Sequence, residues 1–298
     1  MRRSLAALAS TTAAMSVARS PPALVTFDFT GTLCDPKTSV GRAYKDCIIE
    51  VASSAALHER ALLTTTVTSL DEAALSRAFG AAYRAADESK PCFGYGERGG
   101  SREWWLEVVS ATLSNGGLKS DVLEFVLPAA FERLYSRVYA SAEGWQVKPH
   151  SAECLQMLNE WREAQRREGG PGGDLKIGVL SNWDDRLPAL LTDCALAQYV
   201  DVVVTSGAAG VEKPSVEIYD YVRRMAGVRA GARAVHCGDS FSRDIVGATD
   251  AGWEAVFVCP PERIGKLDEA TRAAMRTTPH ILIEDLSGFG SSVLRFDC

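Results

Sequence analysis

The sequence has no long uncharged apolar run, no surplus of basic residues and no pair of cysteines at metal-binding spacing. No window reaches the roughly 18 uncharged apolar residues that a membrane-spanning helix requires, so we expect no membrane span. Lys and Arg number 32 against 38 Asp and Glu, and the net charge of −6 argues against a general nucleic-acid-binding protein. The eight cysteines form no CxxC motif, which favours reduced thiols over a zinc site or a disulfide framework.

Acidic residues are also absent from the start of the chain, where the first is Asp28. Residues 1–22 instead carry Arg2, Arg3 and Arg19 together with four serines and two threonines. Such a segment is typical of a mitochondrial targeting leader, because a basic amphipathic helix is drawn to anionic membranes. We therefore expect mitochondrial import, with a disordered tail on a cytoplasmic protein as the alternative.

After residue 22, short apolar runs alternate with helical patterns. The predicted strands are Leu24–Phe29, Leu175–Leu180, Val200–Thr205, Ala234–Cys237, Glu254–Val258 and Ile281–Ile283. The predicted helices between them are Ser151–Arg167, Arg186–Leu196, Pro214–Ala226 and Phe241–Ala251. This alternation indicates crossover connections, and it predicts an α/β fold with a Rossmann-like parallel sheet covered by helices on both faces.

One interval contains helical patterns alone. Its predicted helices are Gly41–Ala56, Leu70–Ala86, Ser101–Ser114 and Ser120–Tyr139. A length of 298 residues is compatible with two domains. We therefore expect residues 38–142 to form an all-helical cap, inserted after the first strand into a Rossmann-like core of residues 23–37 and 143–298.

Polar residues follow four of the predicted strands. At the end of the first strand the apolar run stops at Asp28, and Gly31 allows a sharp turn just beyond it. The other strands are followed by Ser181 and Asn182, by Lys213, and by the pair Asp239 and Asp244. Because the carboxyl ends of parallel strands border the crevice where α/β folds bind ligands, these side chains are expected to share one site.

These residues carry a family resemblance. Asp28, Ser181, Lys213 and the Gly238-Asp239…Asp244 motif resemble the four motifs of the haloacid dehalogenase-like hydrolase superfamily. The resemblance extends from about Val25 to Ile283 and includes Arg102-Glu103-Trp104-Trp105 in the insert and Ser181-Asn182-Trp183-Asp184 after the second strand. It implies hydrolases with an aspartate nucleophile, most of which are phosphatases.

The resemblance also implies a role for each residue. Asp28 would be the nucleophile that forms an aspartyl-phosphate. Mg²⁺ would be held by Asp28, the Thr30 carbonyl, Asp239 and Asp244. Ser181, with Asn182 as a weaker candidate, would bind the phosphoryl oxygens of a small phosphorylated metabolite, and Lys213 would offset the charge of nucleophile and substrate.

Thr30 departs from the family pattern. Phosphatases of this superfamily usually carry a second Asp at this position, which protonates the leaving oxygen and then activates water. A threonine hydroxyl is not a general base near neutral pH, although it can orient a water molecule by hydrogen bonding. We therefore expect slow turnover, or a preference for good leaving groups.

Three function classes remain open on the sequence alone. The favoured one is a magnesium-dependent phosphatase. The second is a relative without catalytic activity that binds a phosphorylated ligand or a protein, which Thr30 keeps in view. A 2-haloacid dehalogenase is the least favoured, because it would leave the acidic pair Asp239 and Asp244 without a purpose.

Trp104 and Trp105 are the notable aromatic residues of the insert. Trp105 shares helical spacing with Val108, Val109 and Leu113, so at least one of the two tryptophans is expected in the core of the cap. No residue of the insert is assigned to the substrate, and the four histidines receive no role.

Overall fold

A six-stranded parallel sheet forms the centre of the larger lobe. The computed structural model describes residues 20–54 and 70–294. Its sheet contains β1 (Leu24–Phe27), β4 (Lys176–Ser181), β5 (Val202–Thr205), β6 (Ala234–Gly238), β7 (Glu254–Val258) and β8 (Ile281–Ile283). The strands lie in the order β5-β4-β1-β6-β7-β8, and every neighbouring pair is parallel. The predicted Rossmann-like sheet is therefore confirmed, and β1 lies near its middle.

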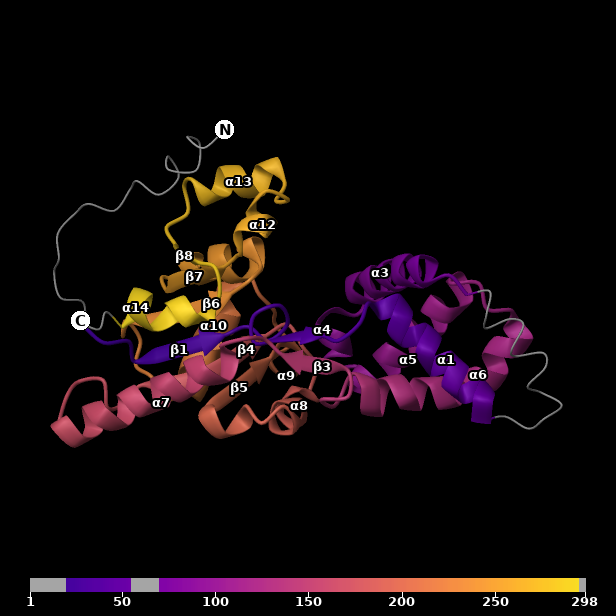
Figure 1. Cartoon of the computed structure of the whole chain (residues 1–298), viewed down its shortest axis with the longest axis horizontal. Coiled ribbons are helices and arrows are strands. Elements are labelled where there is room, and N and C mark those ends of the chain that lie inside the picture. Colours follow the sequence, from indigo (N-terminus) through magenta and orange to yellow (C-terminus); the bar gives the residue numbers. More distant parts are fainter. Residues whose placement is uncertain (1–19, 55–69, 295–298) are drawn as a thin grey trace.

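Helices cover both faces of this sheet (Figure 1). Their bounds are α7 (Ser151–Glu168), α8 (Leu187–Asp193), α9 (Ser206–Ala209), α10 (Val216–Met225), η3 (Phe241–Val246), α11 (Gly247–Asp250), α12 (Pro261–Ile264), α13 (Glu269–Met275) and α14 (Phe289–Val293), with short 3-10 turns η2 (Ala197–Tyr199) and η4 (Leu286–Gly288). On one face Phe27 packs against Phe289, with ring centroids 5.1 Å apart. On the other, Phe257 packs against Phe241 at 5.3 Å. Burial on both faces explains why the strands are continuous apolar runs.

Two of the predicted helices are too long. The helix expected over Arg186–Leu196 ends at Asp193, because Ala195 takes a left-handed backbone conformation with φ 54°. The helix expected to start at Pro214 starts at Val216 instead, and the peptide bond between Lys213 and Pro214 is cis. Pro214 therefore lies in the turn before the helix and is not its first residue.

The insert folds into a helical lobe beside the sheet (Figure 1). It consists of α1 (Val40–Ser54), α3 (Glu72–Ser89), α4 (Pro91–Gly94), α5 (Gly100–Asn115), α6 (Ser120–Arg133) and the π-helical turn η1 (Leu134–Val138). It has its own buried cluster, which includes Ile48, Leu113 and Val126. Trp104 is fully buried in a second cluster, whereas Trp105 is only partly buried. The all-helical cap predicted after the first strand is confirmed.

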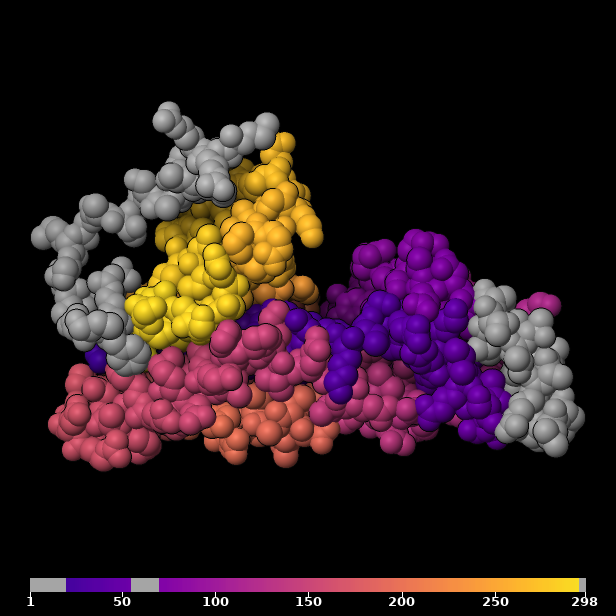
Figure 2. Space-filling view, viewed as in Figure 1, coloured from indigo at the N-terminus to yellow at the C-terminus, as the bar shows by residue number. Residues whose placement is uncertain are grey.

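A short antiparallel ribbon connects the two lobes. It pairs β2 (Cys34–Pro36) with β3 (Trp145–Val147), at the two points where the chain passes between sheet and cap. Space-filling atoms in Figure 2 show the two lobes side by side, with a notch between α3 and the C-terminal part of the larger lobe. Sequence patterns did not predict the ribbon, because three residues are too few to show an alternation.

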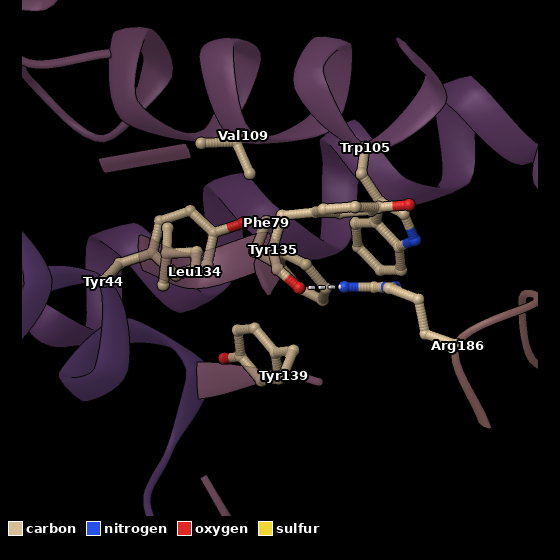
Figure 3. Close-up of a pocket in the computed structure, with 8 residues that line it drawn as sticks. All are labelled: Tyr44, Phe79, Trp105, Val109, Leu134, Tyr135, Tyr139 and Arg186. Atoms are coloured by element: carbon tan, nitrogen blue, oxygen red, sulfur yellow. Dashed lines mark hydrogen bonds between the residues drawn. The ribbon is translucent and has the colours of Figure 1, made fainter. Parts of the chain in front are cut away.

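Arg186 of the larger lobe reaches into the cap. Its guanidinium donates to the Tyr135 carbonyl at 2.5 Å and lies 3.9 Å from the centre of the Tyr135 ring. It closes one end of a cavity of about 40 Å³ whose other walls are apolar and aromatic side chains of the cap, among them Phe79 and Trp105 (Figure 3). Arg186 is therefore one of the residues that join the lobes.

The predicted leader lies almost entirely outside the described residues, so mitochondrial import stays a prediction. Over residues 20–54 and 70–294, no helix combines the length and apolar character needed to cross a membrane.

Candidate active site

Asp28 follows β1 directly and lies at the carboxyl edge of the sheet. Its Oδ1 atom accepts hydrogen bonds from Ser181 Oγ at 2.8 Å and from Lys213 Nζ at 2.8 Å. Ser181 ends β4, the neighbour of β1, so the strand order brings the two side chains together. Among the described residues both donors fall on Oδ1, which leaves the Oδ2 atom of Asp28 facing no protein donor.

Lys213 is a buried ammonium with all three protons engaged. Besides Asp28, its Nζ donates to Asp244 Oδ1 at 2.5 Å and to the Leu180 carbonyl at 2.9 Å. Burial alone would lower the pKa of Lys213, but Asp244 and Asp28 outweigh it and hold this pKa above its ordinary value. The ammonium therefore stays charged and bridges two carboxylates.

Asp244 is held by donors on both of its oxygens. In addition to Lys213, His236 Nε2 lies 3.2 Å from Oδ1, and the Ser240 amide donates to Oδ2 at 2.8 Å. Burial would raise the pKa of Asp244, yet Lys213 and His236 lower it well below its usual range. Asp244 is therefore a carboxylate anion, and few of its lone pairs remain free for another partner.

Asp239 has a different environment. Burial, followed by the charges of Asp28 and Asp244, raises the pKa of Asp239 to about 6, although Arg263 donates to its Oδ2 atom at 2.7 Å. Three carboxylates that repel one another in this way are costly unless a cation neutralises them. One oxygen from each of Asp28, Asp239 and Asp244 lies within 4.8 Å of the others.

Glycine is required at position 31, in the turn beside these acids. Gly31 has φ +84°, and a Cβ atom there would lie 2.5 Å from Asp239 Oδ2. A side chain would therefore strain the backbone and collide with the carboxylate. The sharp turn predicted from the sequence also allows Asp239 to approach the loop after β1.

The side chain of Asn182 braces the backbone of Lys213. Its Oδ1 accepts from the Lys213 amide at 2.9 Å, and its Nδ2 donates to the Lys213 carbonyl at 2.9 Å and to Glu212 Oε2 at 3.3 Å. The amide is thus engaged with protein groups on both of its ends. This geometry gives Asn182 a positioning role toward Lys213, and its predicted role in phosphoryl binding stays a prediction.

Thr30 has one hydrogen-bond partner among the described side chains. Trp183 Nε1 donates to Thr30 Oγ1 at 3.0 Å. The Trp183 ring is held in turn by edge contacts with Phe29 and Trp145, at centroid distances of 5.5 and 5.4 Å. Because the hydroxyl oxygen already accepts a bond from the indole, its own proton is available for an acceptor in the cavity.

Trp183, Arg263 and His236 belong to this site although no role was predicted for them, and Arg243, which also lines the cavity, is a further such residue. Trp183 and Arg263 contact Thr30 and Asp239, as described above. His236, which had been given no role, is buried in β6 and lies 2.8 Å from Thr26 Oγ1 through Nδ1. Burial lowers the pKa of His236, so the ring is neutral: Nε2 donates to Asp244, and Nδ1 accepts from Thr26. A polar residue inside an apolar strand was the only signal for it.

The structure brings all seven predicted site residues to one cavity of about 200 Å³. These residues are Asp28, Thr30, Ser181, Asn182, Lys213, Asp239 and Asp244. The donors at the floor of the cavity are carboxylate oxygens, which suit a hard cation such as Mg²⁺. With an ammonium and a serine hydroxyl beside the same carboxylate, the cavity is equipped to bind a small anion next to a cation.

The fold and the cavity together define an α/β protein with an aspartate-centred site at the edge of a parallel sheet. A family model for haloacid dehalogenase-like hydrolase matches residues 22–252. The chain therefore belongs to the haloacid dehalogenase-like hydrolase family, which confirms the resemblance found in its sequence.

Relatives agree with this assignment. The chain is 33% identical over 239 residues to haloacid dehalogenase-like hydrolase domain-containing protein 3 of Bos taurus, covering 80% of this chain and 82% of that protein. Glyceraldehyde 3-phosphate phosphatase of Methanothermobacter thermautotrophicus is 30% identical over 118 residues, covering 38% of this chain and 48% of that protein. The crystal structure of 2-haloacid dehalogenase from Pseudomonas syringae is similar in fold, with a TM-score of 0.57 and 23% identity over 91% of this chain and 98% of that chain.

Proposed function

We propose that this protein is a magnesium-dependent phosphohydrolase that acts on a small phosphorylated compound through an aspartyl-phosphate on Asp28. The observation that carries the proposal is the bridge from Lys213 to Asp28 and Asp244, with Asp239 beside them. The charged Lys213 side chain and the three carboxylates lie together, so positive and negative charges are balanced around the nucleophile Asp28. A phosphoryl group is the dianionic substrate that such a balance suits.

The residues present fit a magnesium ion. Asp28, Asp239 and the Thr30 carbonyl would hold it, and Asp244, whose oxygens are largely engaged by Lys213, His236 and Ser240, would hold it through water. When bound, the ion would neutralise the carboxylates and the phosphoryl oxygens, so that two anions can approach each other.

The first step is attack by Asp28. Its Oδ2 atom, which faces no protein donor among the described residues, forms the new bond to phosphorus. The bond from phosphorus to the leaving oxygen breaks, and the leaving group departs with the electron pair. Ser181 and Lys213 hold Oδ1 and so fix the rotation of the carboxylate, which aims Oδ2 into the cavity.

Hydrolysis of the aspartyl-phosphate is the second step. Water attacks phosphorus, the bond from phosphorus to the Asp28 oxygen breaks, and the Asp28 carboxylate and inorganic phosphate are released, with the water proton passing to the phosphate or to solvent. With Thr30 in place of the family's second Asp, no positioned carboxylate accepts the water proton. The first step therefore favours leaving groups that are stable as anions, and the second step limits turnover.

The alternatives to this function are a haloacid dehalogenase and a phosphate-binding protein without catalytic activity. The phosphatase name of a relative that matches part of the chain supports the proposed chemistry. A haloacid dehalogenase would bring no metal ion to the three acids, and the pKa of Asp239, which burial and then the charges of Asp28 and Asp244 raise to about 6, would stay raised. A phosphate-binding protein without catalytic activity would use the same cation and the same cavity. Thr30, which replaces the general base of the family, is the feature that favours this alternative.

Phosphate release tests the proposal. We expect release from p-nitrophenyl phosphate and from acyl or enol phosphates in a panel, with a requirement for magnesium. Asp28→Asn should abolish it, because an amide is a poor nucleophile. Magnesium and phosphate binding without release from any member of the panel would instead support the binding protein.

A further inference from the structure

Arg243 is a second cation on the wall of the catalytic cavity. The cavity is lined by two cationic side chains, Lys213 and Arg243. Lys213 is saturated, because its three protons go to Asp28, Asp244 and Leu180. Of the two cations that line the cavity, Arg243 is therefore the one whose protons are not all engaged by the described residues.

The guanidinium of Arg243 is anchored but has free donors. Its Nε donates to Ser240 Oγ at 3.3 Å, and Tyr219 Oη donates to the Arg243 carbonyl at 2.9 Å. Over the described part of the chain, neither terminal nitrogen has a hydrogen-bond or ion-pair partner. The Arg243 side chain is exposed, so it is accessible to a ligand. Its Nε atom and its backbone are already held, so binding a ligand would cost little conformational entropy.

The Arg243 guanidinium interacts electrostatically with Asp87, a residue of α3 in the cap, so it lies near the cap. Burial raises the pKa of Asp87 on α3, and the Arg243 guanidinium partly offsets this increase. The pKa of Glu212 is likewise raised, by burial and by Asp87, and the Arg243 guanidinium partly offsets this increase too. Neither carboxylate lies within the 4 Å of an ion pair with Arg243 in the described structure, so both act on the guanidinium from a distance and leave its terminal protons free.

The cap side is where a leaving group must lie. Asp28 is at the floor of the cavity, and an in-line displacement sends the leaving group away from the attacking oxygen. A cation on the cap side therefore meets the leaving group and not the transferred phosphoryl group.

We propose that Arg243 selects substrates whose leaving group carries a carboxylate, which its two terminal nitrogens bind as a pair. A planar guanidinium matches a carboxylate in this bidentate way, and direct contact outweighs the screened repulsion from Asp87 and Glu212. The inference rests on the proposed function, since it assigns the leaving-group side of the same site.

Phosphonates test the proposal without turnover. Calorimetric titration with magnesium present would compare phosphonoacetate, 3-phosphonopropionate and 4-phosphonobutyrate with ethyl-, propyl- and butylphosphonate. At one chain length the carboxylate should tighten binding about 10- to 100-fold, the range for hydrogen bonds to charged groups. Arg243→Gln should lose this gain, whereas Arg276→Gln, which removes an exposed arginine away from the cavity, should keep it.

Three results would overturn the assignment. They are no gain from the carboxylate at any length, a gain that survives in Arg243→Gln, and an equal loss for carboxylated and alkyl phosphonates in that variant. The last would mean that Arg243 holds the phosphoryl group itself. Because the readout is binding, a protein that shows the carboxylate gain but hydrolyses nothing would contradict the catalytic proposal alone.

Discussion

Thr30 is the residue that sets the rate of the proposed reaction. Trp183 donates to its hydroxyl oxygen, and the rigid aromatic contacts of Trp183 fix where that oxygen lies. The hydroxyl can then donate to a water molecule or to a leaving oxygen, but it cannot take a proton from water near neutral pH. The same indole would donate to a carboxylate placed there, so the position is already prepared for an acid.

Thr30→Asp is expected to speed hydrolysis of the aspartyl-phosphate by about 10²–10⁴-fold, the usual contribution of a positioned general base. The steady-state rate with p-nitrophenyl phosphate and magnesium measures it. Thr30→Asn is the matched control. Asn has nearly the same shape as Asp and can also accept a hydrogen bond from Trp183, but it cannot take a proton from water. An equal gain in both variants would show that shape, and not proton transfer, limits the wild type.

Seven residues of the site could be predicted from the sequence because each lies at or beyond the carboxyl end of a predicted strand. Their mutual order needed only the rule that parallel strands end at one edge. The sequence could not reveal the contact of Arg263, on α12, with Asp239, because no local pattern shows in which direction a long side chain points. The engagement of the Asn182 amide with Lys213 was hidden for the same reason.

At the scale of elements, the loop after β4 joins the cap to the sheet. Asp184 is fully buried and accepts from Arg186 at 2.6 Å and from the Trp105 indole of α5 at 2.6 Å. Arg186 in turn holds the Tyr135 carbonyl of η1. The Asp184 carboxylate thus binds Arg186, which reaches the cap from the larger lobe, and the Trp105 ring of the cap itself, and so it helps to join the two lobes.

Asp184→Asn is expected to destabilise the protein by about 3 kcal/mol, because it leaves the largely buried Arg186 guanidinium without a carboxylate to balance its charge. Urea unfolding followed by circular dichroism measures the free energy. The neighbouring Asp185 is exposed and accepts one hydrogen bond from Ser101, so Asp185→Asn should cost under about 1 kcal/mol. Similar losses of unfolding free energy in the two variants would contradict the role of Asp184 in joining the two lobes.

The element boundaries mark the limit of sequence patterns. Short apolar runs identified the six strands, yet the end of α8 depends on the backbone conformation of a single residue, Ala195. The two-strand ribbon of β2 and β3 is made of residues 109 or more positions apart in the chain. Pairing over such a distance leaves no trace in a local pattern.

At the scale of the whole molecule, the two lobes have separate cores and the acidic site belongs to the larger one. Three carboxylates meet only when β1 and β6 are paired, because Asp28 and Asp239 follow these strands. A cation bound by all three is therefore bound by the folded chain and not by the unfolded one, and such binding stabilises the fold by mass action.

Magnesium should accordingly stabilise the wild type, by about 2.7 kcal/mol at 100 times its Kd. Asp239→Asn should lose this stabilisation. Without magnesium, the variant should be at least as stable as the wild type, because one of three repelling carboxylates is gone. Thermal unfolding with and without magnesium measures both effects. Asp220→Asn, an exposed change on α10, should keep the full magnesium effect; its loss there as well would indicate non-specific binding of the ion.

The most informative single measurement is the covalent state of Asp28 during turnover. The protein would be mixed with p-nitrophenyl phosphate and magnesium, quenched in acid within the first turnovers, and mapped by peptide mass spectrometry beside Asp28→Asn. We expect a burst of nitrophenol that approaches one equivalent per chain, and a phosphate on the peptide of Asp28 that is absent from the variant. Nitrophenol release with no phosphorylated peptide, or an equal label in Asp28→Asn, would contradict Asp28 as the nucleophile.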